Sequence, residues 1–366
     1  MTSGISTEYG RIAPMLAAIE ALVKCESPSG DLEACKNVVK LASDIATRVL
    51  GTPAQIKEIE GRPVFWWGSL TPEVLVLAHL DTVWPQGSYT PLWEVNGDVI
   101  RGPGVFDMKA GFVQALYALK DIEGSVALVA TTDEETGSFA SRELIKTLSS
   151  NAKAVLVLEA SLDGKVKTGR KGTAMYKVSV HGLASHAGLE PEKGINATTE
   201  IAHIILSLAA LEDSSHGTTV VPTLLQSGSS ANTVPDLAVL EIDARSFSES
   251  ELMRIDSAIK SIKATTPGAK VEITGGLNRP PLQPSSTKSL YERAEKVAKE
   301  IGMSPLGAAE VGGASDGNFA AAAGAQVLDG LGAVGGGAHA PNEWVSLKSI
   351  EPRSAFLHAF IKDLLK

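Results

Sequence analysis

The sequence predicts an α/β protein with a mixed, mostly parallel sheet and a smaller α+β domain inserted into it. Three apolar segments, beginning at Val74, Val126 and Ala154, indicate strands that are buried on both faces. They alternate with helical segments, as in a parallel sheet covered on both sides. Between Thr173 and Gly276 the pattern changes to strand–helix–strand–strand–helix–strand, which indicates a split βαβ, ferredoxin-like domain.

Periodicity and turn residues predict the elements of the larger domain. Apolar residues of the segment 31–50 recur on one broad helical stripe. The loop 101–107 leads into a helix from about Met108 to Lys120, and Asp107 stands where a helix N-cap would stand. We expect further helices over 13–24, 138–149, 286–301 and 350–365, and strands near 54–60, 63–68 and 326–328.

The inserted segment is long enough to be a domain of its own. A chain of 366 residues suggests roughly two domains at about 150 residues each. We expect a catalytic domain in two parts, 1–171 and 279–366, around an inserted domain of residues 172–278, with a return hinge over Gly276–Leu282. The expected strands of the insertion are 173–181, 218–227, 236–245 and 270–274, and its helices are 194–211 and 248–263.

Composition excludes several classes of protein. The 33 basic and 42 acidic residues give a net charge of −9 without a long run of one sign, which argues against nucleic acid or an anionic membrane as partner. The sequence predicts neither a signal peptide nor a membrane-spanning segment. Cys25 and Cys35 match neither a zinc spacing nor a disulfide framework, so we expect free thiols in a reducing cytoplasm.

The three buried strands end in polar residues. They run into His79-Leu-Asp81, Asp133-Glu-Glu135 and Glu159. Binding sites in such sheets form outside the carboxyl ends of the strands. His79 and Asp81 are two residues apart and share one face of the strand, and a metal-binding histidine needs a partner that fixes its ring. The alternative interpretations are a strand-end histidine bonded to a turn, a helix cap at Asp107 and solvated acidic doublets.

A glycine-rich loop carries another candidate, His339, and glycines let such a loop approach other segments closely. Two imidazoles and three carboxylates suit zinc or a similar divalent metal, with Mn or Co as substitutes. Five ligands exceed the need of one open zinc, so a bridging carboxylate would divide them between two metals. These candidate ligands are His79, Asp107, Glu135, Glu159 and His339.

Glu134 precedes a candidate ligand, and on an extended chain the two side chains would point in opposite directions. A carboxylate beside a metal site is a natural general base for an attacking water. The stretch Gly330–Gly335 matches G-x-G-x-x-G, but no helix is predicted to open inside it, so we do not expect a dinucleotide site.

The motifs together resemble the M20 family of metallopeptidases, and in detail its glutamate carboxypeptidase branch. The resemblance runs essentially end to end, with the motifs in the family's order. They are His79-Leu-Asp-Thr82, Gly104-Val-Phe-Asp-Met-Lys109, Asp133-Glu-Glu-Thr-Gly137, Leu158-Glu-Ala160, Ser185-His-Ala-Gly188 and Gly337-Ala-His-Ala-Pro341. The resemblance implies a zinc-exopeptidase-like catalytic domain and an inserted lid and dimerisation domain. Ala110 departs from the glycine that many relatives have there.

The resemblance also implies roles for single residues. Asp107 matches the ligand that bridges two zinc ions, His79 and Glu159 match ligands of one zinc, and Glu135 and His339 match ligands of the other. Two further matches are Glu134 as the general base and Asp81 as the carboxylate that orients His79. The substrate-side matches are His186, Asn232, Arg245 and, for the substrate's terminal carboxylate, Arg279.

We therefore expect a cytoplasmic, homodimeric two-zinc carboxypeptidase that acts on small peptides or N-acyl amino acids with a C-terminal glutamate. Lys165, Arg170 and Lys171 offer positive partners for the glutamate side chain, although a solvated basic turn explains them equally well. The alternative enzyme is an N-acyl amino acid deacylase of the acetylornithine deacetylase type. A non-catalytic scaffold on this fold would have lost Glu134 or a ligand, and all are present.

Overall fold

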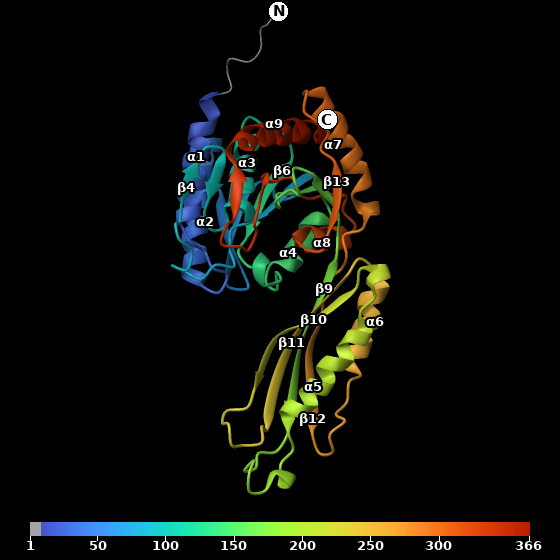
Figure 1. Cartoon of the computed structure of the whole chain (residues 1–366). Helices are drawn as coiled ribbons and strands as arrows, with labels where there is room; N and C mark the ends of the chain where they lie inside the picture. Colours follow the sequence, from blue (N-terminus) through green and yellow to red (C-terminus); the bar gives the residue numbers. More distant parts are fainter. Residues whose placement is uncertain (1–8) are drawn as a thin grey trace, which may run out of the picture. The chain divides into compact units, whose positions relative to one another are not determined.

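The structure is a computed structural model that describes residues 9–366 (Figure 1). The chain divides into two compact units. Unit 1 comprises the chain up to Gly169, with Gln283–Val311 and Ser315–Lys366, and unit 2 comprises Arg170–Leu282 with Gly312–Ala314.

A six-stranded sheet forms the centre of unit 1, in the order β1-β2-β6-β3-β7-β14. Strands β6, β3, β7 and β14 are parallel to one another. Strand β2 is antiparallel to both β1 and β6. The sheet is therefore mixed and mostly parallel, as the sequence predicts. The strands are β1 Gln55–Ile59, β2 Arg62–Gly68, β3 Val74–His79, β6 Val126–Thr131, β7 Ala154–Val157 and β14 Val327–Leu328.

Helices cover both faces of this sheet. Val74, Val76 and Ala78 of β3 point into a core that includes apolar residues of α1, α2, α3, α7 and α9. On the other face α8 packs so closely that a Cβ at Gly317 would lie 3.1 Å from Cγ2 of Val157. The helices are α1 Tyr9–Lys24, α2 Leu32–Leu50, α3 Ala110–Leu119, α4 Arg142–Ser149, α7 Lys288–Glu300, α8 Asp316–Ala322 and α9 Leu347–Leu364. No helix in the described part of the chain is long and apolar enough to cross a membrane.

The sequence does not predict six of the shorter strands or helix α8, although it predicts the two-residue strand β14. Four of these strands form an antiparallel sheet in the order β15-β16-β5-β4, and β8 and β13 form a separate pair. The stretch Gly330–Gly335 leads into β15 and opens no helix, in agreement with the sequence analysis. The strands are β4 Glu94–Asn96, β5 Val99–Arg101, β8 Val166–Arg170, β13 Ala308–Val311, β15 Gly335–Gly336 and β16 Trp344–Ser346.

Unit 2 contains a four-stranded antiparallel sheet in the order β10-β11-β9-β12, with α5 and α6 packed on one face (Figure 1). Every second residue of β9 and β11 is buried under these helices, and the residues between them are mostly exposed on the opposite face. The elements are β9 Gly172–His181, α5 Ala197–Leu208, β10 Thr219–Ser227, β11 Leu237–Ser246, α6 Glu249–Lys260 and β12 Lys270–Arg279.

Strand β12 is longer than predicted. It pairs with β9 as far as Arg279, which lies opposite Thr173, so the prediction of a hinge from Gly276 is wrong for its first four residues. Gly275 has a φ of +93° and a Cβ there would lie 2.1 Å from the carbonyl oxygen of Met175. Its missing side chain allows the two strands to stay paired through a sequence that otherwise indicates a loop.

Candidate metal centre

The carboxyl ends of β6, β3 and β7 meet at one edge of the unit 1 sheet, because these strands are parallel neighbours. His79 is the last residue of β3, Glu159 lies two residues beyond β7, and Glu134 and Glu135 lie in the turn after β6. The sheet therefore places four residues of the predicted site side by side.

Asp107 joins this group from a turn over Val105–Lys109 that precedes α3. Its backbone is not helical (φ −117°, ψ 89°), and the N-cap position of α3 is Lys109, so the interpretation of Asp107 as a cap is wrong. The carboxylate Oδ1 lies 3.1 Å from Nε2 of His79, and Oδ2 lies 3.4 Å from Nε2 of His339. Each oxygen of one carboxylate thus faces a different imidazole.

The two imidazoles define two overlapping groups. Nε2 of His339 also lies 3.0 Å from Oε2 of Glu135. Nε2 of His79 lies 3.7 Å from Oε1 of Glu159, and donor atoms of His79, Glu134 and Glu159 all lie within 4.8 Å of one another. His339 has a left-handed backbone (φ 61°) in its loop and is 51% exposed, whereas His79 is 1% exposed, so one side of the cluster opens to solvent.

The prediction of an extended chain at Glu134 and Glu135 is wrong, because both residues lie in a 3₁₀ turn. The carboxylate of Asp81 holds this turn by accepting the N–H groups of Glu134 (3.4 Å) and Glu135 (3.2 Å). Ser29 Oγ donates to the same carboxylate at 2.7 Å. Nδ1 of His79 lies 3.0 Å from the carbonyl oxygen of Asp81 and 3.5 Å from its carboxylate, so both groups of Asp81 face the imidazole.

Glu343, for which the sequence predicts no role, is 1% exposed. Its carboxylate accepts hydrogen bonds from the backbone N–H groups of Gly104, Phe106 and Asp107, at 3.0, 2.8 and 3.1 Å. Burial raises the pKa of Glu343 to about 7. Its only signal in the sequence is its place four residues after His339, because its partners are main-chain groups more than 200 positions away.

The electrostatics favour a cation in the cluster. Hydrogen bonds with Asp107 and Glu135 raise the pKa of His339 to about 10. Burial opposes the ionisation of Asp107, but hydrogen bonds with His339 and His79 hold the pKa of Asp107 far below its usual value. Positive charge beside these carboxylates is therefore favourable. The five carboxylates that face these rings belong to Asp81, Asp107, Glu134, Glu135 and Glu159.

This donor set fits a divalent metal. Imidazole nitrogens and carboxylate oxygens are ligands of zinc, and the excess of carboxylates requires positive charge. Nδ1 of His79 contacts the carbonyl oxygen of Asp81, so Nε2 is the ring nitrogen that faces the carboxylate of Asp107. Divalent ions held by these side chains would supply the positive charge that balances the carboxylates.

The predicted substrate-side residues lie in unit 2. His186 pairs with Thr233 in an isolated bridge, and its Nδ1 accepts the N–H groups of Gly188 and Leu189. The side chain of Asn232 accepts from Ser230 Oγ at 2.7 Å. The last two residues are Arg245, which forms two hydrogen bonds with Asp243 at 2.8 and 3.0 Å, and Arg279, which is 7% exposed at the end of β12.

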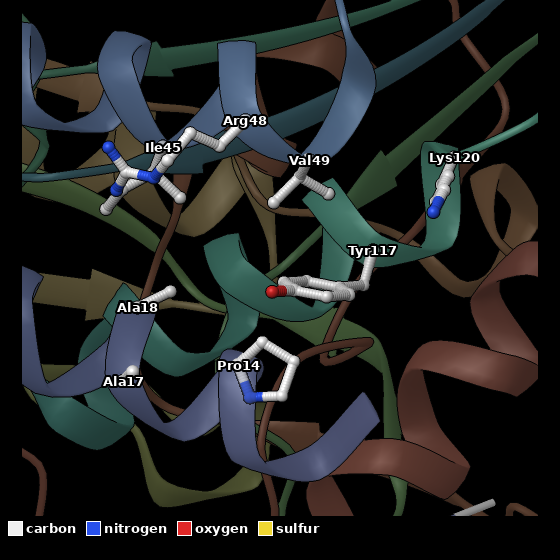
Figure 2. A pocket seen from close by; sticks show the side chains of 8 residues that line it. All are labelled: Pro14, Ala17, Ala18, Ile45, Arg48, Val49, Tyr117 and Lys120. Carbon is white, nitrogen blue, oxygen red and sulfur yellow. The ribbon is translucent and has the colours of Figure 1, made fainter. Parts of the chain in front are cut away.

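The described residues of unit 1 line at least two pockets. One is lined by loops around Pro28–Asp31 and Thr82–Gln86 and by Glu135 and Thr136, so it adjoins the cluster. The other lies among α1, α2 and α3 and contains none of the predicted site residues (Figure 2). Its lining is Pro14, Ala17, Ala18, Ile45, Arg48, Val49, Tyr117 and Lys120.

The chain matches known sequences over most of its length. The sequence model of peptidase family M20/M25/M40 matches residues 75–363. The chain is 32% identical to carboxypeptidase G2 of Pseudomonas sp. (strain RS-16) over 309 residues, which is 80% of this chain and 74% of that protein. It is 26% identical to a succinyl-diaminopimelate desuccinylase of Dechloromonas aromatica over 335 residues, covering 81% of this chain and 85% of that protein.

Solved structures share the fold. The crystal structure of a tripeptidase from Staphylococcus aureus has a TM-score of 0.74 at 23% identity and covers 97% of this chain and 99% of that one. An M20 family metallo-carboxypeptidase from Sulfolobus solfataricus has a TM-score of 0.74 at 18% identity, with coverages of 95% and 98%.

Proposed function

Because this chain belongs to peptidase family M20/M25/M40, a family of metal-dependent hydrolases of amide bonds, we propose that it is a two-zinc exopeptidase of the carboxypeptidase type. Its substrates are small peptides or N-acyl amino acids, and it releases a C-terminal amino acid, with a preference for glutamate. The observation that carries the proposal is the position of Asp107, whose two oxygens face His79 and His339 separately. Glu159 and Glu135 complete the two halves of the site.

The metals, when bound, supply positive charge that polarises the scissile carbonyl and makes the attacking water more acidic. Glu134 takes the proton of that water and delivers it to the leaving amine. Glu134 lies in the turn held by the Asp81 carboxylate, and the carbonyl oxygen of Asp81 faces Nδ1 of His79, so the base and the orientation of His79 depend on one residue. Arg279 supplies a guanidinium that binds the terminal carboxylate of the substrate through two hydrogen bonds.

The preference for glutamate is supported by the resemblance of the motifs to the glutamate carboxypeptidase branch and by the basic residues Lys165 and Lys171. Arg170 is 2% exposed and donates to the carbonyl oxygens of Gly313 and Ala314, so it does not support this preference. The relatives named succinyl-diaminopimelate desuccinylase keep a second candidate open, an N-acyl amino acid deacylase with the same metals and the same base. Release of free amine from a panel of acyl-glutamate, acyl-alanine, acyl-leucine and acyl-ornithine, with and without a chelator, tests both. A tenfold higher kcat/KM for acyl-ornithine or for an apolar leaving group would replace the glutamate assignment.

The proposed assembly is a homodimer formed through unit 2. Strands β10 and β12 are the edges of its sheet, and an uncovered edge can pair with another chain. Strand β10 exposes Val221, Leu224 and Leu225 by 46%, 60% and 51%, which is unusual for apolar side chains on a free edge. Burial of these side chains in a second copy would remove them from water.

A further inference from the structure

Glu343 connects two segments that each carry a residue of the metal cluster. It is the fourth residue after His339, and its carboxylate accepts hydrogen bonds from the turn that carries Asp107. Oε2 also lies 3.4 Å from Nε1 of Trp84, which extends the contact to the loop after β3. One buried side chain in the loop of His339 therefore contacts two other loops of the site.

The turn needs such an acceptor. Its residues Asp107 and Met108 have non-helical backbone angles, so the regular helical pattern of hydrogen bonds does not pass through them. Buried N–H groups without an acceptor are costly, and the Glu343 carboxylate accepts from three of them. The packing leaves little room for adjustment, because a Cβ at Gly104 would lie 2.5 Å from Cγ2 of Thr82.

The loop of His339 is held equally closely to Glu343. The N–H of Glu343 donates to the carbonyl of Ala340 at 3.0 Å. A Cβ at Gly337 would lie 3.1 Å from Cα of Glu343, so the loop folds back onto this residue. A shift of Glu343 would therefore move His339 and Asp107 relative to each other.

We propose that Glu343 is a positioning residue of the metal site, which fixes the Asp107 carboxylate against the His339 imidazole in the geometry that binds the metal. This inference rests on the proposed metal site. It assigns a function to a buried acid outside the five candidate metal ligands. Mutation of a residue that holds a metal ligand in place commonly lowers metal affinity by roughly 10- to 100-fold.

The test compares zinc affinity, measured by competition with a chromophoric chelator, in wild type and in Glu343→Gln. The amide keeps the shape, but its NH₂ group faces backbone N–H donors, so the turn must move. We expect zinc affinity to fall roughly 10- to 100-fold and the visible spectrum of the cobalt-loaded protein to change. The matched control is Glu200→Gln in unit 2, a fully buried glutamate that also accepts two backbone N–H groups, from Thr265 at 2.9 Å and Thr266 at 2.7 Å. This control should lose stability and keep its zinc affinity.

A second pair of variants covers the case that Glu343→Gln does not fold. Gly337→Ala adds a Cβ that crowds Glu343 without changing any charge. Gly324→Ala introduces the same backbone strain at a glycine of similar φ, where the added Cβ would have no neighbouring atom within 4 Å. Only Gly337→Ala should weaken zinc binding. Equal zinc affinity in wild type and in both Glu343→Gln and Gly337→Ala would overturn the positioning role. A wild-type protein without zinc affinity would overturn the proposed function as well.

Discussion

The imidazole of His339 and the carboxylate of Glu135 lie 3.0 Å apart, and Glu135 is preceded by the carboxylate that we propose as the general base. Two neighbouring glutamates thus take different positions: Glu135 pairs with His339, whereas Glu134 lies near His79 and Glu159. Substitution of each one separately should therefore have a different effect.

Glu134→Gln should keep its metal and lose turnover. Glutamine preserves the shape of the side chain but cannot accept the proton of water, and the loss of a general base costs roughly 10²–10⁴-fold in kcat. Metal content and kcat should be measured on the same preparation. Glu135→Gln is the comparison, because it should lose metal affinity first. A Glu134→Gln protein that retains more than a tenth of wild-type kcat, taking roughly 10²-fold as the smallest expected loss, would exclude this role.

The metal stoichiometry should be two divalent ions per chain. One open zinc site needs about three protein ligands, whereas the cluster offers His79, Asp107, Glu135, Glu159 and His339. Elemental analysis of protein purified without chelator and then saturated with zinc gives the count. A result of one equivalent after saturation would contradict a bridging role for Asp107.

Arg279→Ala should raise KM for acyl-glutamate and leave the metal content unchanged. Loss of a charged hydrogen-bond donor to the substrate carboxylate corresponds to roughly a 10- to 100-fold effect. Arg279→Lys keeps the charge without the two-pronged geometry and should be intermediate. Unchanged KM in both variants would remove Arg279 from substrate binding.

Substitution on strand β10 should convert a dimer to a monomer. Leu224→Lys places a charge on the exposed apolar edge of unit 2, where Leu224 is 60% exposed. The matched control is Ile56→Lys on β1, the edge of the unit 1 sheet, where the side chain is 50% exposed. Sedimentation velocity should show a monomer only for Leu224→Lys. If wild type already sediments as a monomer at working concentrations, the dimer proposal fails.

The stability of unit 2 should depend on the ionisation of Glu200. Burial opposes its charged form, but hydrogen bonds from Thr266 and Thr265 lower its pKa from 4.5 to about 2. Because the folded-state pKa is the lower one, Glu200 stabilises the fold fully above about pH 4.5, and this contribution is lost as the pH falls towards about 2. Urea unfolding at several pH values should show that the difference between wild type and Glu200→Gln shrinks over this range. A difference that stays constant with pH would contradict the argument.

Much of the fold can be predicted from the sequence, because apolar runs and turn residues mark its elements locally. The apolar runs that begin at Val74, Val126 and Ala154 predict β3, β6 and β7, and the comparisons with solved structures confirm the fold class. The strands that the sequence does not predict, β4, β5, β8, β13, β15 and β16, have two to five residues and no apolar run like that of β7. The sequence predicts a strand β12 that is too short, because glycine usually indicates a turn. In the structure Gly275 instead allows β12 and β9 to lie close together.

The residues of the candidate site also differ in how well the sequence predicts their positions. Residues at strand ends, such as His79 and Glu159, are found from the strands themselves. The backbone of Asp107 depends on Glu343, a residue 236 positions later in the chain, so the sequence suggests a helix cap where the structure has a turn. Interactions between a side chain and distant main-chain groups leave no pattern in a single sequence.

The pairing of Thr173 with Arg279, and of Arg170 with Leu282, brings the entry and the exit of unit 2 together on adjacent strands. Two antiparallel strands can be joined by a turn of about two residues. The whole segment between Arg170 and Leu282 is therefore exchangeable for a short hairpin turn without a gap in the backbone. In evolutionary terms, a single insertion or deletion of genetic material at this position would add or remove nearly all of unit 2. The chain on either side would stay paired as it is now.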